Sequence, residues 1–377
     1  MFVGSLLFAT LALYARQVMI VAYILAGAAI GPLGLGWITD TTLIEQSSNI
    51  GIMFLLFLLG LDLSPIKLIK LFRSMLFVAG LSSAAFGLLG YAFGQLAGLP
   101  QIDSIVLGFA VMFSSTIIGI KLLPTTALHH RPIGEVIISV LLLQDLIALG
   151  VLITMHSMDS QLPFMYSAAL LVATLPVFIL ACHFLVKWVV SHLLARFDRF
   201  KEYTFLLAIA WCLGVAEAAE TIGFSYETGA FIAGITLAAN PLAPYLTESL
   251  KPIRDFFLVV FFFSLGAEIQ LETIAPVIYP ALLLAAGILI LKPLIFKWTI
   301  KVSSNHKGNS SEIGVRLGQG SEFSLLIAAL ASTQGLIGDE TKYLIQLACI
   351  ISFLVSPYWI ILRYPSPLAL NEKLRRD

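Results

Sequence analysis

Apolar runs long enough to cross a lipid bilayer recur from one end of this 377-residue sequence to the other, with short polar connections between them. About 20 apolar residues in a helix cross a hydrocarbon core about 30 Å thick. Hydrophobic residues make up 59% of the chain and charged residues 12%, against about 25% charged in an ordinary soluble domain. The sequence therefore predicts an all-α polytopic membrane protein, and no stretch is left for a separate soluble domain.

Composition also excludes several partners. The net charge is zero, and no basic run is interleaved with aromatic residues, so a nucleic-acid partner is not expected. The three cysteines, Cys182, Cys212 and Cys349, lie inside apolar runs without paired spacing. They predict buried thiols rather than a disulfide framework or a metal site. No cofactor is predicted for this chain.

Hydropathy predicts thirteen spans. They lie near residues 2–15, 18–32, 48–64, 74–97, 104–123, 133–155, 164–190, 202–219, 225–239, 252–268, 274–299, 312–334 and 341–362. The first is short for a span, but it lacks the basic start and the cleavage site of a signal peptide.

The basic residues give the orientation. Lys and Arg gather in cytoplasmic connections, and 20 of the 22 fall in or beside the odd-numbered loops and the carboxyl-terminal tail. The exceptions are Lys342 and Lys292. The amino terminus is therefore expected outside and the carboxyl terminus in the cytoplasm, with a bacterial inner membrane as the expected location.

Two pairs of segments predict an internal repeat that inverts. "AYILAGAAIGP" (22–32) resembles "GAFIAGITLAANP" (229–241) at an offset of 207, and "FLLFLLGLDL" (54–63) resembles "VFFFSLGAEI" (260–269) at 206. The matched spans are seven apart, an odd number, so the halves must face opposite ways across the membrane. Inverted repeats of this kind are typical of secondary transporters.

The repeat defines the predicted domain organisation. A single membrane transport domain covers residues 1–377, with repeat one at about 18–155, repeat two at about 225–362 and linking helices at about 164–219.

The offset also pairs two polar stretches in mid-span, "FSSTIIG" (113–119) and "QGSEFSL" (319–325). Their polar and small residues are Ser114, Ser115 and Thr116 in the first, and Gly320, Ser321 and Glu322 in the second. Unwound backbone at membrane depth is tolerated where it is buried in protein or lines a watery cavity. We therefore expect two crossed discontinuous helices. The alternative is that the hydroxyls bond back to helical carbonyls and the glycine allows close packing.

"LLLQDLIAL" (141–149) places Gln144 and Asp145 in an otherwise apolar run. At 1.5 Å per residue, Asp145 lies about 18 Å from the cytoplasmic end of its helix, near the bilayer centre. An ionised Asp there costs at least about 2.5 to 3.5 kcal/mol. Burial favours the protonated acid and a bound cation favours the carboxylate, so proton and cation compete for it. The alternative is a protonated structural Asp that bonds a neighbouring helix.

Two other charged residues have open roles. Lys292, the other charge inside a span, is interpreted either as an ion-pair partner of Asp145 or as a side chain that reaches the interface. Glu322 is expected to stabilise half-helix ends or to share in the ion path. Arg316 is expected to be an interfacial anchor.

The chain resembles the transmembrane domain of the Kef-type potassium/proton antiporters, in the second monovalent cation:proton antiporter family. The resemblance covers nearly all of the chain and is carried by "LAGAAIGPLGLGWITD", "GIMFLLFLLGLDL", "FSSTIIGIKLL", "LLLQDLIAL", "TGAFIAGITLAANP", "SLGAEIQL" and "GQGSEFSLLIA". It implies a homodimer in the membrane lipid, each protomer with a scaffold and a six-helix core that moves like an elevator.

The same resemblance implies roles for residues. Asp145 would carry cation and proton alternately with Gln144 beside it, and the breaks around Ser115 and Glu322 would complete the site. Lys292 matches the lysine of the family's eleventh span. Electrogenic sodium relatives have two adjacent acids where this sequence has Gln-Asp, so electroneutral exchange is expected. The nucleotide-binding regulatory domain of Kef-type systems is absent from this sequence, and it is expected to be separate or truncated.

The favoured function is exchange of potassium for protons, with sodium as the first alternative. A sodium-coupled organic-anion symporter and a cation channel remain alternatives, because both use a polar site at mid-membrane. An enzyme is not expected: the sequence has no HExxH motif, no paired intramembrane aspartates and no Ser-His constellation at helix depth.

Overall fold

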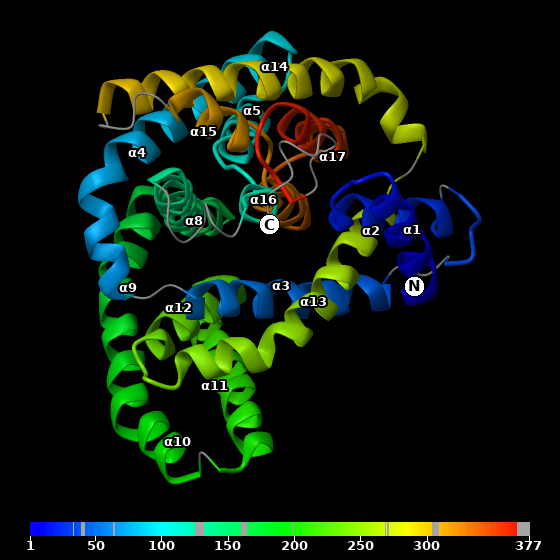
Figure 1. Ribbon diagram of the computed structural model, residues 1–377. Coiled ribbons are helices and arrows are strands. Elements are labelled where there is room, and N and C mark those ends of the chain that lie inside the picture. Colours follow the sequence, from blue (N-terminus) through cyan, green and yellow to red (C-terminus); the bar gives the residue numbers. More distant parts are fainter. Residues whose placement is uncertain are drawn as a thin grey trace.

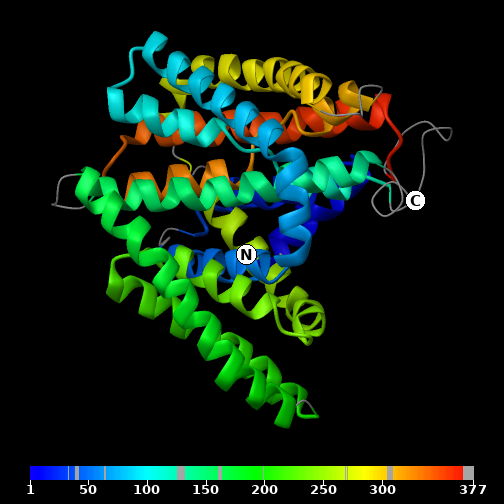
Figure 2. The ribbon, with the colours of Figure 1, turned by 90° about the vertical axis from the view of Figure 1, so that its left-hand side faces the viewer.

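The computed structural model describes the chain except for residues 33, 39–41, 63–64, 125–131, 160–163, 198, 268, 270, 304–308 and 368–377. Within the described residues the regular elements are helices, which confirms the predicted all-α class. They pack as two bundles, a core bundle and a scaffold bundle. The core bundle lies above and most of the scaffold bundle lies below in Figure 1. Figure 2 shows the same two layers from the side.

The core bundle is built from eight helical pieces. They are α4 (Pro65–Leu96), α5 (Gln101–Val111), α6 (Thr116–Lys121), α8 (Pro132–Asp159), α14 (Leu271–Ser303), α15 (Ser310–Arg316), α16 (Glu322–Thr333) and α17 (Asp339–Arg363).

The scaffold bundle holds the remaining described elements. They are α1 (Phe2–Tyr14), α2 (Met19–Ile30), α3 (Thr42–Asp62), α9 (Phe164–Leu185), the π-helical turn η1 (Val186–Val190), α10 (Ser191–Phe197), α11 (Lys201–Ile222), α12 (Tyr226–Ala238) and α13 (Ala243–Ala267).

The described helices group into thirteen segments, as predicted, once three interrupted helices are each taken as one span. The α5–α6 and α15–α16 pairs are interrupted at residues 112–115 and 317–321, in the two stretches that the sequence marked as discontinuous. The third, α9–η1–α10, continues through a π-helical turn without unwinding. Several segments are longer than hydropathy indicated: α3 and α4 begin earlier, α13 begins at Ala243, the α9–α10 segment reaches Phe197, and α8 and α14 extend at both ends.

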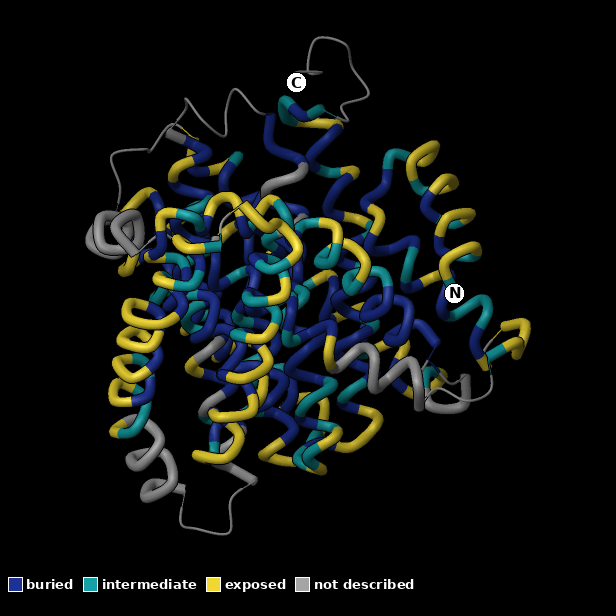
Figure 3. The backbone as a smooth tube through the Cα atoms, turned by 90° about the horizontal axis from the view of Figure 1, so that it is seen from below, coloured by how far each residue is buried: buried dark blue, intermediate teal, exposed yellow. Residues whose placement is uncertain are grey.

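Length, composition and exposure place the protein in a membrane. Six described helices are long and apolar enough to cross a bilayer, and five shorter apolar helices accompany them. Buried positions gather in the interior and exposed positions lie on the outward faces of the peripheral helices (Figure 3). Many exposed residues are large and apolar, among them Leu6, Trp188 and Leu283. Apolar side chains facing outward in this number indicate contact with lipid.

Glycines allow the scaffold helices to approach closely. A Cβ on Gly234 of α12 would lie 2.1 Å from the carbonyl oxygen of Phe57 in α3, and a Cβ on Gly266 of α13 would lie 1.9 Å from that of Ile24 in α2. Small residues at such crossings are typical of membrane helices. In the predicted repeat, α2 is equivalent to α12 and α3 is equivalent to α13. Exchanging the two repeats therefore turns the α3–α12 contact into the α13–α2 contact, and both contacts are present. The inverted repeat itself stays a prediction.

These crossings predict that Gly234→Ala destabilises the protein. The added methyl group meets backbone that cannot rotate away, so we expect a loss of about 1 to 3 kcal/mol, seen as a lower thermal unfolding temperature in detergent. Gly214→Ala is the matched control, because a Cβ there has no neighbour within 4 Å. In a helix interior, that change is expected to be neutral or to stabilise. Equal effects of the two variants would contradict this packing.

Candidate functional site

The two interrupted helices contact each other directly at their breaks. The Ser324 hydroxyl in α16 donates to the carbonyl oxygen of Ala110 in α5 at 2.5 Å. The Gln319 amide, in the second break, donates to the carbonyl oxygen of Ser115 in the first at 3.5 Å. Backbone groups freed by unwinding need partners inside the protein. The two breaks supply partners to each other, which explains why the polar stretches occur as a pair in the sequence.

Lys292 of α14 binds both breaks at once. Its ammonium group donates to the carbonyl oxygens of Phe113 at 2.5 Å and Gln319 at 3.1 Å, and it lies 4.8 Å from the centre of the Phe86 ring. These carbonyls follow the carboxyl ends of α5 and α15, where helices leave acceptors unsatisfied and carry partial negative charge. Lys292 thus supplies the positive charge that stabilises the crossing.

Burial contradicts the interpretation in which Lys292 reaches the interface, and its ion pair with Asp145 stays a prediction. Its side chain is 1% exposed, so it does not reach the interface. Among the described residues it forms no ion pair with Asp145. Hydropathy gave the depth of Lys292 along α14, but it could not give the direction of the side chain.

The second halves of the two interrupted helices are α6 and α16. Their amino ends carry two serine hydroxyls and the Glu322 carboxylate. The Ser115 hydroxyl accepts from the backbone N–H of Ile118, which caps α6, and donates to the Glu322 carboxylate at 2.5 Å. Ser321 caps α16 by accepting from the N–H of Phe323 at 3.1 Å. A hydrogen bond between Ser115 and Glu322 therefore joins the two breaks, and Ser321 acts as a helix cap.

Gln144 braces the first break. Its side-chain carbonyl accepts from the N–H of Ser114 at 3.2 Å, and its amide donates to the carbonyl oxygen of Met112 at 3.1 Å and to the Ser83 hydroxyl at 3.4 Å. The side chain is fully buried. In this arrangement Gln144 replaces the helical partners that unwinding removes, and it positions the segment that carries Thr116.

Asp145 is buried, with 3% of its surface exposed. One carboxylate oxygen, Oδ1, lies 3.5 Å from the Thr116 hydroxyl, which is at the long limit of a hydrogen bond. The other, Oδ2, has no hydrogen-bond partner among the described residues, and the same is true of the Ser114 hydroxyl. Buried polar atoms are normally satisfied. An unsatisfied carboxylate oxygen marks a position where a proton or a cation is stabilising.

A groove of about 350 Å³ leads from the surface to this site between the two bundles. Its apolar walls come from α3, α13 and α16. Thr116 and Glu322 are its polar residues near the breaks, and Arg254 and Asp255 of α13 are its charged residues. A second, apolar cavity, too small to admit water, is lined by Asp145.

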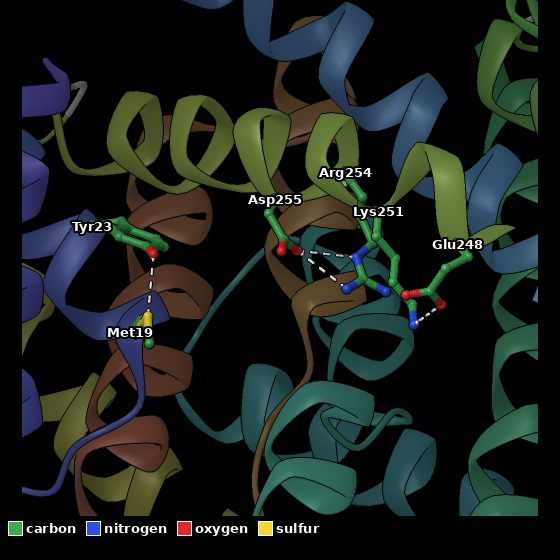
Figure 4. A network of polar contacts seen from close by, with 6 residues as sticks. All are labelled: Met19, Tyr23, Glu248, Lys251, Arg254 and Asp255. Atoms are coloured by element: carbon green, nitrogen blue, oxygen red, sulfur yellow. Dashed lines mark hydrogen bonds and ion pairs between the residues drawn. The ribbon is translucent and has the colours of Figure 1, made fainter. Parts of the chain in front are cut away.

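The charged residues of α13 are paired with each other. The Arg254 guanidinium contacts Asp255 through two nitrogens at 3.2 Å, and Lys251 bonds Glu248 (Figure 4). Tyr23 of α2 points instead to the Met19 sulfur (Figure 4). Exposed pairs of this kind add about 0 to 1 kcal/mol to stability. Arg254 and Asp255 place both signs of charge on the wall of the groove.

Arg316 is a structural residue of the core bundle. It is 1% exposed, so its interpretation as an interfacial anchor is wrong. Its guanidinium donates to the carbonyl oxygens of Leu122 at 2.9 Å and Pro365 at 2.6 Å, and it pairs with Glu312 at 2.9 Å. These contacts join the end of α6 to α15 and to the segment after α17.

The structure thus collects the candidate residues around one crossing. Asp145, Thr116 and Glu322 line cavities, whereas Gln144, Ser115, Ser321 and Lys292 hold the breaks in place. Sequence reasoning missed two residues, Gln319 and Ser83. Gln319 lies in the second break and accepts from Lys292, and Ser83 accepts from Gln144, which braces the first break. Gln319 is a polar residue within the quoted "GQGSEF" stretch, so it could have been found. Ser83 belongs to the Ser82–Ser83 pair of an apolar helix, and two small hydroxyl residues in such a helix do not indicate which distant segment they bond.

Two further predictions about composition can be compared with the described residues. All three cysteines are free and buried, as predicted. No group of three or more His, Cys, Asp or Glu side chains that could hold a metal ion occurs in the part of the chain that the structure describes.

The fold and the site define a membrane-embedded secondary transporter. The chain belongs to the sodium/hydrogen exchanger family, whose transmembrane model matches residues 2–361. The family confirms the resemblance to cation/proton antiporters that the sequence motifs indicated, and it supports monovalent cation/proton antiport as the activity class.

Curated relatives agree on the transporter class. The chain is 28% identical over 358 residues to a protein of Paramagnetospirillum magneticum named iron transporter MagA, covering 92% of this chain and 80% of that one. It is 29% identical to K(+) efflux antiporters 4 and 6 of Arabidopsis thaliana, covering 96% and 91% of this chain. The chain spans only 62% and 59% of these two plant proteins.

A solved structure shares the fold. The sodium proton antiporter MjNhaP1 of Methanocaldococcus jannaschii, determined at pH 8, superposes with a TM-score of 0.70. The match covers 95% of this chain and 94% of that one at 18% sequence identity. At that identity the likeness shows the architecture alone.

The contacts of Lys292 predict a stability effect. Lys292→Met leaves two buried carbonyls without their charged donor, which we expect to cost on the order of 3 kcal/mol, measured by thermal unfolding in detergent. Lys301→Met is the matched control, because Lys301 is an exposed lysine of the same helix. A double-mutant cycle with Asp145→Asn should give additive effects. Strong coupling between the two changes would instead indicate an ion pair and contradict the observed arrangement.

Proposed function

We propose that this protein exchanges one monovalent cation for one proton across the membrane, with Asp145 carrying each in turn. The observation that supports it is the buried Asp145 carboxylate, which has one unsatisfied oxygen and one oxygen next to the Thr116 hydroxyl. Thr116 also lines the groove between the bundles. The carboxylate is therefore sequestered from bulk water and linked through one hydroxyl to a route from the surface.

Competition at one carboxylate is sufficient for exchange. Removal from water favours the neutral acid, and a cation held against the carboxylate favours the charged form. Neither an empty ionised site nor a site with both ligands is stable at this depth, because each leaves an uncompensated charge in a low-dielectric interior. Only the proton-loaded and cation-loaded forms then cross the membrane, which couples the two fluxes.

Exchange of this kind is electroneutral if Asp145 is the sole carrier. Glu322 is the second carboxylate at the site, but it accepts a hydrogen bond from Ser115 at 2.5 Å and lies in the first turn of α16. A hydroxyl donor and a helix amino end both stabilise a carboxylate in its charged form. These contacts favour the charged form of Glu322, which then provides a negative potential that attracts cations into the groove.

We propose an elevator movement of the core bundle against the scaffold bundle. The carrier, both breaks and Lys292 belong to the core bundle, whereas the opposite wall of the groove comes from α3 and α13. Moving the core bundle as a unit carries the site from one side to the other without disturbing the contacts at the crossing. The homodimer, the outside amino terminus and the bacterial inner membrane belong to the same proposal, and they rest on the sequence.

Potassium is the proposed cation, with sodium as the alternative. The two plant relatives are named as K(+) efflux antiporters, which favours potassium, whereas the matching family model is described as a sodium/hydrogen exchanger, which keeps sodium as the alternative. The name of the bacterial relative adds iron. Against a transition metal, no group of three or more His, Cys, Asp or Glu side chains that could hold one occurs among the described residues.

The carrier role predicts that Asp145→Asn abolishes exchange. In proteoliposomes, potassium-driven dissipation of a pH gradient should fall at least a hundredfold, because the amide neither binds a proton at neutral pH nor balances a cation. Asp145→Glu should retain part of the activity. Asp339→Asn, an acid-to-amide change at an exposed position, is the control and should leave the rate unchanged. Exchange retained by Asp145→Asn would refute the proposed carrier.

Electroneutrality makes a separate prediction. A membrane potential imposed with a lipophilic ion should leave the initial exchange rate unchanged, because no net charge moves in a one-for-one cycle. Running each alkali cation in turn under the same conditions ranks potassium against sodium. A rate that rises severalfold with the potential would show that more than one proton moves per cation.

A further inference from the structure

We propose that Leu56 and Phe323 form an apolar partition that separates Asp145 from the groove and controls when a cation reaches it. The inference rests on the proposed function of Asp145. Both residues line the groove, and both also line the small cavity that contains Asp145. They are the two residues that the two cavities share, so their side chains lie between the route from the surface and the carboxylate.

The two halves of the partition come from different bundles. Leu56 belongs to α3 of the scaffold bundle, and Phe323 belongs to α16 of the core bundle. The small cavity is completed by Phe231 of α12 and Leu152 of α8. When the core bundle moves against the scaffold bundle, Phe323 must slide past Leu56. The movement that carries the site therefore also opens or closes the way to the carboxylate.

Phe323 is held in place by the second break. Its backbone N–H donates to the capping Ser321 hydroxyl at 3.1 Å, and its ring lies 6.3 Å from the ring of Phe113 in the first break. The residue preceding it, Glu322, faces the groove and accepts from Ser115. The same short segment thus places the carboxylate that attracts a cation next to the ring that blocks it.

Such a partition treats the two substrates differently. A hydrated cation must lose its water to pass between apolar side chains, and the cost of removing an ion from water is several kcal/mol. A proton can instead reach Asp145 Oδ1 through the Thr116 hydroxyl, which lines the groove and lies 3.5 Å from that oxygen. In this conformation the partition admits the proton and delays the cation, so it sets the order of loading.

Thiol labelling tests the partition independently of transport. The three native cysteines are buried, so an added cysteine can be followed with a small cationic methanethiosulfonate reagent on the full-length protein in vesicles. Leu59→Cys, on the groove wall, should react quickly. Asp145→Cys should react at least a hundredfold more slowly. Adding Phe323→Ala or Leu56→Ala should raise the Asp145→Cys rate at least tenfold and leave the Leu59→Cys rate unchanged.

Phe323→Leu is the conservative variant and should keep Asp145→Cys slow, because a leucine still fills the gap. Two alanine variants are used so that a folding defect in one leaves the other to decide. Equal labelling of Leu59→Cys and Asp145→Cys in the parent protein would overturn the partition. A rate at position 145 that neither alanine variant changes would overturn it as well. Failure of the proposed exchange would appear in the transport assays and leave these rates unaffected.

Discussion

The structure depends on one constraint, which is that backbone unwound inside a membrane must find its hydrogen bonds within the protein. Two spans unwind, and each break satisfies groups of the other. Lys292 donates to the carbonyls of Phe113 and Gln319, and Ser115 caps α6 while it binds Glu322. Positive charge lies beyond the carboxyl ends of α5 and α15, and negative charge lies at the amino end of α16. The crossing is stable because its charges are paired this way.

The position of Asp145 follows from the same crossing. The neighbouring residue Gln144 holds the first break by two contacts and is itself held by Ser83 of α4, and this fixes Thr116 beside the carboxylate. Among the described side chains at the breaks, the buried polar atoms have structural partners except Asp145 Oδ2 and the Ser114 hydroxyl. The supporting residues of this site have their hydrogen-bond partners, and one oxygen of the Asp145 carboxylate has none. That carboxylate is therefore the place where a bound ligand stabilises the site. Exchange then needs only that place and a route to it.

The sequence predicted the fold well because its main signals are local. Runs of apolar residues fixed the thirteen segments, and polar residues in mid-span fixed both breaks. Depth along a helix placed Asp145, but depth does not give side-chain direction, and that is why Lys292 and Arg316 were misinterpreted. Contacts between distant segments, such as Ser83 with Gln144 or Leu56 with Phe323 around a cavity, depend on how the bundles pack. They leave no periodic pattern in a single sequence.

The central claim is that a cation and a proton compete for Asp145, and direct binding measures this. Purified protein in weakly buffered detergent solution is titrated with potassium or sodium while released protons are counted. In the pH range where the free carrier is protonated, the account predicts about one proton released per cation bound, and a cation affinity that falls about tenfold for each further pH unit downward. Cation binding that releases no protons and does not change with pH would contradict it.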